Sequence, residues 1–246
     1  MNGGIEEFYR FYMMEHLYDT HFHLDLQNDR AAAIREIENN QIYTIAVTNL
    51  PDLYRKETAE INSKYIRFAL GFHPELVHQF KKQIPLMWEL LTEARYVGEV
   101  GLDFVDKTYK AEQIAFFSEL IERCRYHDNK ILTIHSRQAV REILDIIGDD
   151  FKFKPILHWF SGNTSELQEA VEKGFFFSVN GAMLATKKAV KLLDIIPKER
   201  VLIETDSPFT YLYGSYINTL SRIEKVLKEN KKEVDVWDNF KAILSK

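Results

Sequence analysis

The segment Tyr18-Asp19-Thr20-His21-Phe22-His23-Leu24-Asp25 contains two histidines separated by a single residue. Side chains of a β-strand alternate between its two faces, so in an extended segment both imidazoles point the same way, whereas in a helix they diverge. Two imidazoles on one side suit zinc, manganese or iron. Asp19 and Thr20 suit the end of a strand, and a strand-end pair bonded to backbone or solvent explains this segment equally well. The rest of the chain has to decide.

Short apolar runs recur along the chain, and segments with helical periodicity separate them. The runs, which we predict to be strands, span residues 17–20, 42–47, 66–70, 96–100, 131–134, 155–157, 175–179 and 201–203. The predicted helical segments include residues 31–38, 111–125, 140–147, 166–172 and 189–196. This alternation predicts an α/β fold, a single-domain (β/α)8 TIM barrel, and nearly continuous apolar strands fit a parallel sheet covered on both faces.

The two ends of the chain are predicted to lie outside this repeating pattern. Residues 1–15 are rich in aromatic side chains and would form a short N-terminal extension, either a lid packed on the domain or a segment that docks a partner. Residues 16–246 would form the barrel domain. From residue 216 to residue 246 we expect one or two closing helices, with Trp237 and Phe240 docked on the barrel wall.

The composition fits one globular domain, because 246 residues that are 46% hydrophobic and 28% charged can bury a full core. We find no apolar run long enough to span a membrane and no secretion signal, and the single Cys124 excludes an internal disulfide and fits a reducing compartment. The sequence therefore predicts a cytoplasmic protein without a membrane partner. A net charge of −5 gives no general positive field for nucleic acid, so phosphate binding must be local.

Active sites of (β/α)8 barrels lie at the carboxyl-terminal ends of the strands, so the residues that follow each predicted strand matter most. Five of the eight histidines stand there, and Glu99 and Asp206 follow the fourth and eighth strands. We interpret four of these histidines and both carboxylates as ligands of two divalent ions. One ion is assigned His21, His23 and Asp206, the other is assigned His135 and His158, and Glu99 bridges the two.

Paired divalent ions lower the pKa of water to about 7 and neutralise charge on a phosphoryl oxygen. Asp206 is predicted to be the catalytic proton acceptor as well as a ligand, and Glu99 to be the catalytic bridge. His73 and Arg137 fall outside the ligand set, and we assign both to binding the substrate phosphate, Arg137 as a fork-shaped clamp and His73 as a donor. A structural salt bridge between Arg137 and an acid of the barrel is the alternative.

Six motifs together resemble the TatD family of metal-dependent hydrolases, which are amidohydrolase-like barrels. They are the H-x-H pair at 21–23, Gly-x-His-Pro at 71–74, Gly-Glu-Val-Gly-Leu-Asp at 98–103, His-Ser-Arg at 135–137, His-Trp-Phe-Ser-Gly at 158–162 and Glu-Thr-Asp-Ser-Pro at 204–208. The resemblance implies that the six ligands named above bind the metals, that the cofactors are two divalent ions (magnesium, manganese or zinc), and that the activity is that of a DNase, often a 3′-to-5′ exonuclease.

A closer resemblance is carried by residues 43–49, 69–77 and 156–162, which are similar to QatD, the TatD-like subunit of the bacterial Qat anti-phage system. This resemblance implies a role in phage defence. It also implies partner subunits, namely an ATPase, a QueC-like protein and a fourth subunit.

The chain departs from the general TatD pattern after Pro208. Family members tend to carry an Arg-Asn-x-Pro segment there, whereas this chain continues with Phe-Thr-Tyr-Leu-Tyr-Gly at 209–214. Tyr211 and Tyr213 either stack on the bases of a frayed or single strand or cover the rim of the barrel. The acidic balance argues against gripping long duplex, because such binding grows with the number of phosphates neutralised. We therefore expect a DNA end or a short single strand as the substrate.

Two other classes of function remain open from the sequence. A related barrel hydrolase acting on an amide, ester or amine, such as a deacylase or deaminase, would use the same activated water. Many such enzymes bridge their metals with a carboxylated lysine at strand four, and Glu99 at that place favours the TatD-like branch. A non-catalytic scaffold subunit is the third possibility, and the intact set of ligands argues against it.

Overall fold

The computed structural model of the chain describes residues 17–210, 214–231 and 234–245. The N-terminal extension predicted at residues 1–15 lies outside the described residues, and so do Tyr211 and Tyr213.

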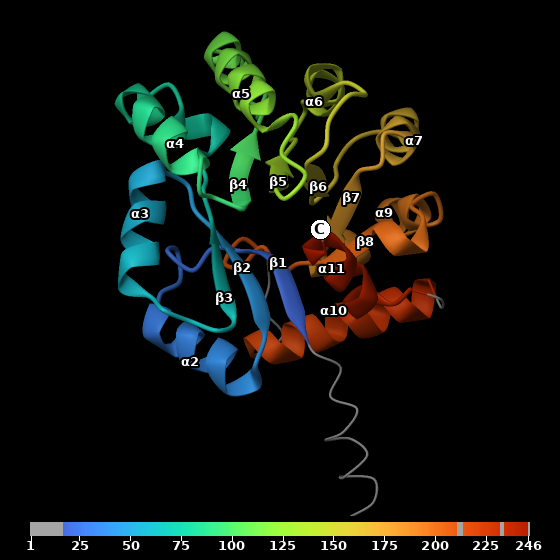
Figure 1. Ribbon diagram of the computed structural model, residues 1–246. Coiled ribbons are helices and arrows are strands. Elements are labelled where there is room, and N and C mark those ends of the chain that lie inside the picture. The colour runs from blue at the N-terminus through green and yellow to red at the C-terminus, as the bar shows by residue number, and fades with distance from the viewer. Residues whose placement is uncertain (1–16, 211–213, 232–233, 246) are drawn as a thin grey trace, which may run out of the picture.

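Eight parallel strands form a ring with helices around its outside (Figure 1). The strands are β1 (Tyr18–Phe22), β2 (Tyr43–Val47), β3 (Ile66–Ala69), β4 (Tyr96–Gly101), β5 (Ile131–His135), β6 (Lys154–His158), β7 (Phe176–Val179) and β8 (Val201–Ile203). They hydrogen-bond in sequence order as two sheets, β1 to β3 and β4 to β8. The predicted (β/α)8 barrel is confirmed, because each strand pairs in parallel with the next strand of its sheet and both gaps between the sheets are bridged.

Short contacts close the ring at both junctions between the two sheets. Leu70, just after β3, forms an isolated parallel bridge with Val97 of β4. On the other side, the backbone amide of Asp206 donates to the carbonyl of His21 at 2.9 Å, and that of His23 donates to the carbonyl of Ser207 at 3.1 Å. The first and last strands of the chain are thereby joined at the end where the predicted ligands lie.

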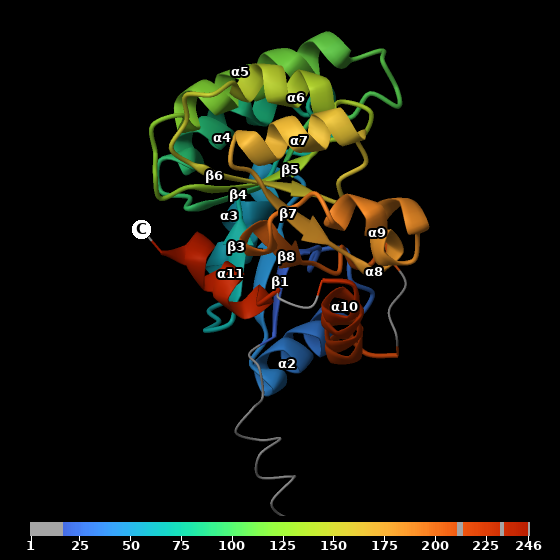
Figure 2. The same cartoon turned by 90° about the vertical axis from the view of Figure 1, so that its right-hand side faces the viewer.

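Helices cover the outer face of the ring, with α5, α6 and α7 on one side of the strands and α2 and α10 on the other (Figure 2). The helices are α2 (Arg30–Asn40), α3 (Pro51–Glu60), α4 (Ile84–Leu91), α5 (Lys110–Cys124), α6 (Val140–Ile147), α7 (Thr164–Glu172), α8 (Gly181–Leu184), α9 (Lys187–Leu193), α10 (Tyr216–Asn230) and α11 (Val236–Leu244). The apolar periodicity explains helices such as α6, which buries Val140, Ile143, Leu144 and Ile147 on one face. None of the described helices is long and apolar enough to cross a membrane.

The sequence suggested that the closing helices dock on the outer wall of the barrel. The last helix, α11, instead closes the amino-terminal end of the barrel. The ring of Phe240 stacks on Tyr18 at the start of β1, with centroids 4.2 Å apart and planes 9° from parallel. The side-chain amide of Asn239 donates to the carbonyl of Val201, the first residue of β8, at 2.7 Å. The helix therefore seals the end of the core that lies opposite the predicted ligands.

Strand β1 is longer than predicted, because Asp19 and Thr20 lie inside it and not at its end. Both side chains are buried. The Asp19 carboxylate accepts hydrogen bonds from the amide of Thr205 at 3.1 Å and from the hydroxyl of Tyr216 at 3.0 Å. These donors let a polar residue occupy a core strand, although burial raises the pKa of Asp19 to about 7. As a result, His21 is held within the strand itself.

Candidate metal centre

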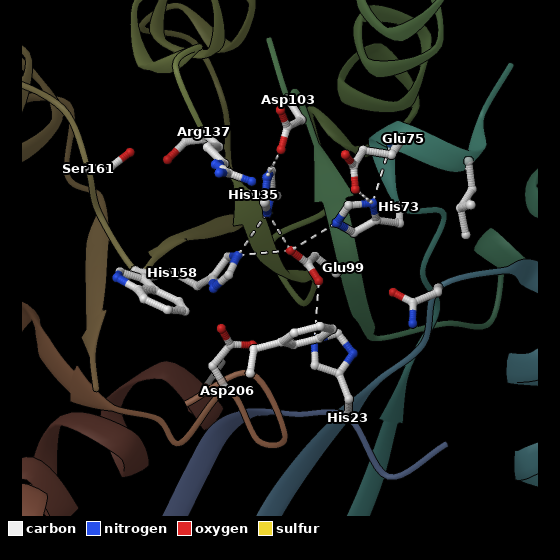
Figure 3. Close-up of a pocket in the computed structure, with 15 residues that line it drawn as sticks. His23, His73, Glu75, Glu99, Asp103, His135, Arg137, His158, Ser161 and Asp206 are labelled. Atoms are coloured by element: carbon white, nitrogen blue, oxygen red, sulfur yellow. Dashed lines mark hydrogen bonds and ion pairs between the residues drawn. The ribbon is translucent and has the colours of Figure 1, made fainter. Parts of the chain in front are cut away.

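The six predicted ligands converge at the carboxyl-terminal end of the barrel, although they come from five different strands or the residues just after them. Figure 3 shows Glu99 in the middle, with His23 and Asp206 on one side and His135 and His158 on the other. All but His135 are nearly inaccessible, with exposed fractions of 5% or less.

The first group of donors lies around one point. The two Nε2 atoms of His21 and His23 are 3.2 Å apart. Each of them lies 3.4 Å from Oε2 of Glu99, and Oδ1 of Asp206 lies 3.5 Å from the first and 3.4 Å from the second. Nitrogen ligands about 2.0–2.1 Å from a divalent ion are separated from their neighbours by roughly 2.9–3.4 Å. The four donor atoms therefore have the spacing of a shared ion.

The second group is organised around the other oxygen of Glu99. Oε1 of Glu99 lies 2.6 Å from Nδ1 of His135 and 2.9 Å from Nε2 of His158, and these two nitrogens are 3.3 Å apart. Nε2 of His73 lies 3.6 Å from the same oxygen. Glu99, His73 and His135 together form one of the groups of side chains able to hold a metal ion. The sequence analysis assigned His73 to binding the substrate phosphate. The structure places its imidazole beside the predicted metal ligands Glu99 and His135.

The charge on Glu99 is balanced by the imidazoles around it. Burial raises the pKa of this carboxyl group, but the neighbouring charges of His73, His158 and His21 and a hydrogen bond with His135 outweigh burial. The net result is a pKa well below the usual value, so Glu99 is ionised. A buried carboxylate with one oxygen in each donor group is suited to bridge two cations.

The pKa values of the two histidines of the second group, His135 and His158, shift in the opposite direction. Burial lowers the pKa of His158, but the charges of Glu99 and Glu204 raise it well above the usual value in the metal-free protein. The pKa of His135 is also raised, because hydrogen bonds with Asp103 and Glu99 outweigh burial. A divalent ion needs neutral imidazoles as ligands, so its binding must displace protons from this group.

Two further acids orient the second group, and the sequence analysis gave neither of them a role. Oδ2 of Asp103 lies 2.9 Å from Nε2 of His135, the ring nitrogen that faces away from Glu99. Glycine at position 101 makes this possible: its φ is 139°, and a Cβ there would lie 2.1 Å from the carbonyl oxygen of His135. The place of Asp103 in the Gly-Glu-Val-Gly-Leu-Asp motif was the available signal.

Glu204 plays the corresponding part for His158. Its Oε1 lies 3.8 Å from Nδ1 of His158 and accepts hydrogen bonds from the Trp159 amide at 3.1 Å and from the side-chain amide of Asn180 at 3.0 Å. Its other oxygen accepts from the hydroxyl of Ser178. Carboxylates that face the remote nitrogen of a histidine ligand fix the orientation of the ring.

Arg137 is exposed and lines the same cavity as the ligands. Among the residues that the structure describes, its guanidinium forms no ion pair, although its charge contributes to the lowered pKa of Asp103. The salt-bridge alternative therefore has no partner within the described parts of the chain. The guanidinium is left available for an anion.

The cavity above the ligands has a volume of about 650 Å³, which is within the usual range for small-molecule sites. Besides the histidines and acids, it is lined by two aromatic side chains, Trp159 and Phe209. Arg137 is the one arginine or lysine among its described lining residues. The floor of the cavity is thus formed by imidazoles and carboxylates together, and its wall carries one arginine and two aromatic side chains.

Comparisons of this chain with a family model, with curated proteins and with solved structures all find TatD-related proteins or metal-dependent hydrolases. The model of the family described as TatD related DNase matches residues 18–238. An uncharacterized metal-dependent hydrolase of Methanocaldococcus jannaschii is 29% identical over 177 residues, which cover 69% of each chain. Human deoxyribonuclease TATDN3 is 25% identical over 214 residues, which cover 78% of each chain. The crystal structure of a TatD homolog from Escherichia coli superposes with a TM-score of 0.76 at 22% identity, covering 93% of this chain and 95% of that one.

Proposed function

This chain belongs to the TatD related DNase family, and on that premise we propose that it is a two-metal phosphodiesterase that removes nucleotides from single-stranded or frayed DNA ends. Its class is that of the metal-dependent hydrolases acting on ester bonds. The observation that supports two ions is the placement of Glu99, which has one carboxylate oxygen in each group of donors. His21, His23 and Asp206 would hold one ion, and His135 and His158 the other.

Divalent ions bound by these residues supply Lewis-acid charge and lower the pKa of water towards neutrality. Asp206 is proposed to take the proton of the attacking water. Burial raises the pKa of its carboxyl group, but a hydrogen bond with His23 and the charges of His21 and His158 outweigh burial and hold the pKa below its usual value. The carboxylate is therefore ionised at neutral pH and able to accept that proton.

Arg137 is proposed to hold the phosphate that is cleaved. A guanidinium presents a planar fork of donors that matches two oxygens of a phosphate, and this contact strengthens as negative charge develops on the phosphoryl group. With no ion pair to acids in the described residues, it keeps these donors free for the substrate. His73, which lies against Glu99, is proposed to assist as a donor from the floor of the cavity.

Replacement of Arg137 by alanine is expected to lower kcat/KM for DNA by about 10- to 100-fold, the loss that removal of a charged hydrogen bond causes. Arg137→Lys keeps the positive charge without the planar fork of donors, so its kcat/KM should lie between those of the unaltered protein and the alanine variant. The thermal midpoints of both variants should match that of the unaltered protein, because the exposed side chain supports no described ion pair. Unfolding of the alanine variant would show that Arg137 is a structural residue instead.

A preference for ends and single strands follows from the charge of the molecule. The net charge is −5, and one guanidinium lines the cavity among the described residues. Binding along a duplex requires many phosphates to be neutralised, and this protein has no surplus of positive charge for that purpose. A single phosphate next to a terminal nucleotide needs only one clamp.

The direct test is digestion of end-labelled single-stranded DNA by metal-stripped protein, with magnesium, manganese or zinc added back. We expect metal-dependent shortening from one end, which also gives the polarity, and loss of shortening in Glu99→Gln. If metal binds at the site and no DNA is cleaved with any of the three ions, the nuclease proposal fails. A deacylase or deaminase activity, or an activity that needs partner subunits, would then be the better account.

In the cell, we propose a cytoplasmic role in phage defence together with the other Qat subunits. The support is the resemblance of residues 43–49, 69–77 and 156–162 to QatD and the presence of a single, buried cysteine. A plaque assay tests this role: cells carrying the four genes should resist phage, and the same cells with the Glu99→Gln variant should not. If cells with the Glu99→Gln variant resist phage equally well, the catalytic activity of this subunit is not needed for defence.

A further inference from the structure

We propose that the ring of Phe209 is a stacking surface for the base of the terminal nucleotide, so that the enzyme selects unpaired, base-bearing ends. The inference rests on the proposed nuclease function and adds a residue that determines specificity. Phe209 lines the cavity, and 62% of its surface is exposed. Single exposed apolar side chains are common on protein surfaces, so the inference rests on where this ring lies, in the lining of the cavity beside the metal ligands.

The ring is close to the metal ligands. It stands edge to face with the imidazole of His23, with centroids 5.1 Å apart and planes at 86°. Among the described residues, no other aromatic ring contacts it. An exposed aromatic ring in the cavity lining, in contact with a ligand, is therefore available to stack on the base of a nucleotide whose phosphate binds at the ligands.

The backbone holds Phe209 in a fixed relation to the site. Its amide donates to the carbonyl of Asp206 at 2.8 Å, in a turn that begins with Asp206 at a φ of 50°. The next residue, Thr210, is buried and its hydroxyl donates to the carbonyl of Thr205. The stacking surface is therefore preorganised by the same turn that presents the ligand, which lowers the entropic cost of binding.

The chemistry of the cavity points to a nucleobase as the group that the ring meets. Every base has a π-face, and stacking on an aromatic side chain is tolerant of sequence. The second aromatic side chain of the cavity belongs to Trp159, which directly follows His158. The backbone amide of Trp159 donates a hydrogen bond to the carboxylate of Glu204. A base inside a duplex already stacks on its neighbours and is paired, so contact with Phe209 requires a frayed or single-stranded end.

The test compares cleavage of single strands that carry either a normal or an abasic terminal nucleotide. Phe209→Leu keeps the apolar bulk and removes the π-face, and we expect it to reduce the ratio of the two rates by about 5- to 150-fold. Phe209→Tyr should restore the ratio. Tyr126→Leu is the matched control, because that side chain is 63% exposed but lies just before β5, at the opposite end of the barrel.

A binding measurement separates stacking from catalysis. A strand ending in 2-aminopurine loses fluorescence when that base stacks. In the Asp206→Asn background with magnesium, we expect quenching that Phe209→Leu abolishes and Tyr126→Leu leaves intact. An unchanged rate ratio and unchanged quenching in Phe209→Leu would overturn the inference, and so would an equal loss on both substrates, which would mean that the ring merely supports His23. Failure of the unaltered protein to cleave any DNA would overturn the nuclease function itself.

Discussion

Glu99→Gln is expected to lower DNA cleavage by more than about 10³-fold, which exceeds the usual effect of removing one transition-state contact. The carboxylate contributes one oxygen to each donor group, at 3.4 Å from Nε2 of His23 and 2.6 Å from Nδ1 of His135. A glutamine has one oxygen acceptor, no charge and an NH2 group that cannot bind a cation. Both halves of the site are therefore damaged by one substitution.

The measurement is kcat together with metal content per chain. We expect fewer bound ions in Glu99→Gln. Glu75→Gln removes an equal charge from the same cavity and should keep the full metal content, because the Glu75 side chain is 60% exposed and, at 3.8 Å from Nδ1 of His73, is beyond hydrogen-bond distance of that ring. The barrel should stay folded, since imidazoles that lose a carboxylate partner become neutral instead of remaining as buried cations. Full activity and full metal content in Glu99→Gln would contradict the bridging role.

Asp206→Asn is expected to reduce kcat by about 10²- to 10⁴-fold, the usual contribution of a positioned proton acceptor. Asparagine is a poor base and a weaker ligand, but it suits the backbone. Asp206 has a φ of 50°, and asparagine adopts this left-handed conformation more readily than most residues. The backbone amide at position 206 donates a hydrogen bond to the carbonyl of His21 at 2.9 Å, and this contact does not involve the side chain. The turn, and with it the closure of the barrel, should survive the substitution.

The control is Asp103→Asn, a change of the same kind at an acid that lines the cavity and is hydrogen-bonded to the predicted ligand His135. It should cost about 10- to 100-fold in metal affinity or activity, the usual effect of losing a residue that orients a ligand. Thermal midpoints with and without added metal establish that both variants are folded. Turnover by Asp206→Asn at the rate of the unaltered protein would rule out this residue as the proton acceptor.

The fold was largely predictable because the signals for it are local. Most strands are apolar runs, and each predicted strand has a counterpart in the barrel, with bounds that shift by at most a few residues. The largest difference is in β1, where Asp19 looked like a strand end because its carboxylate is polar. Its partners, Thr205 and Tyr216, are distant in the sequence, so no local pattern could show that this carboxylate would be satisfied inside the core.

The sequence by itself determined which residues stand at the carboxyl-terminal ends of the strands, because the position of a residue after an apolar run is a local property. That was enough to name the six candidate ligands, and Arg137 as a further candidate. The sequence also suggested how these ligands are shared between two ions, but only the tertiary structure gave the geometry: the two oxygens of Glu99 point to different groups, and His73 lies beside the second group. The same holds for the acids that orient His135 and His158, and for the exposed ring of Phe209 beside His23. These relations join residues far apart in the chain, and they arise when the ring of strands closes.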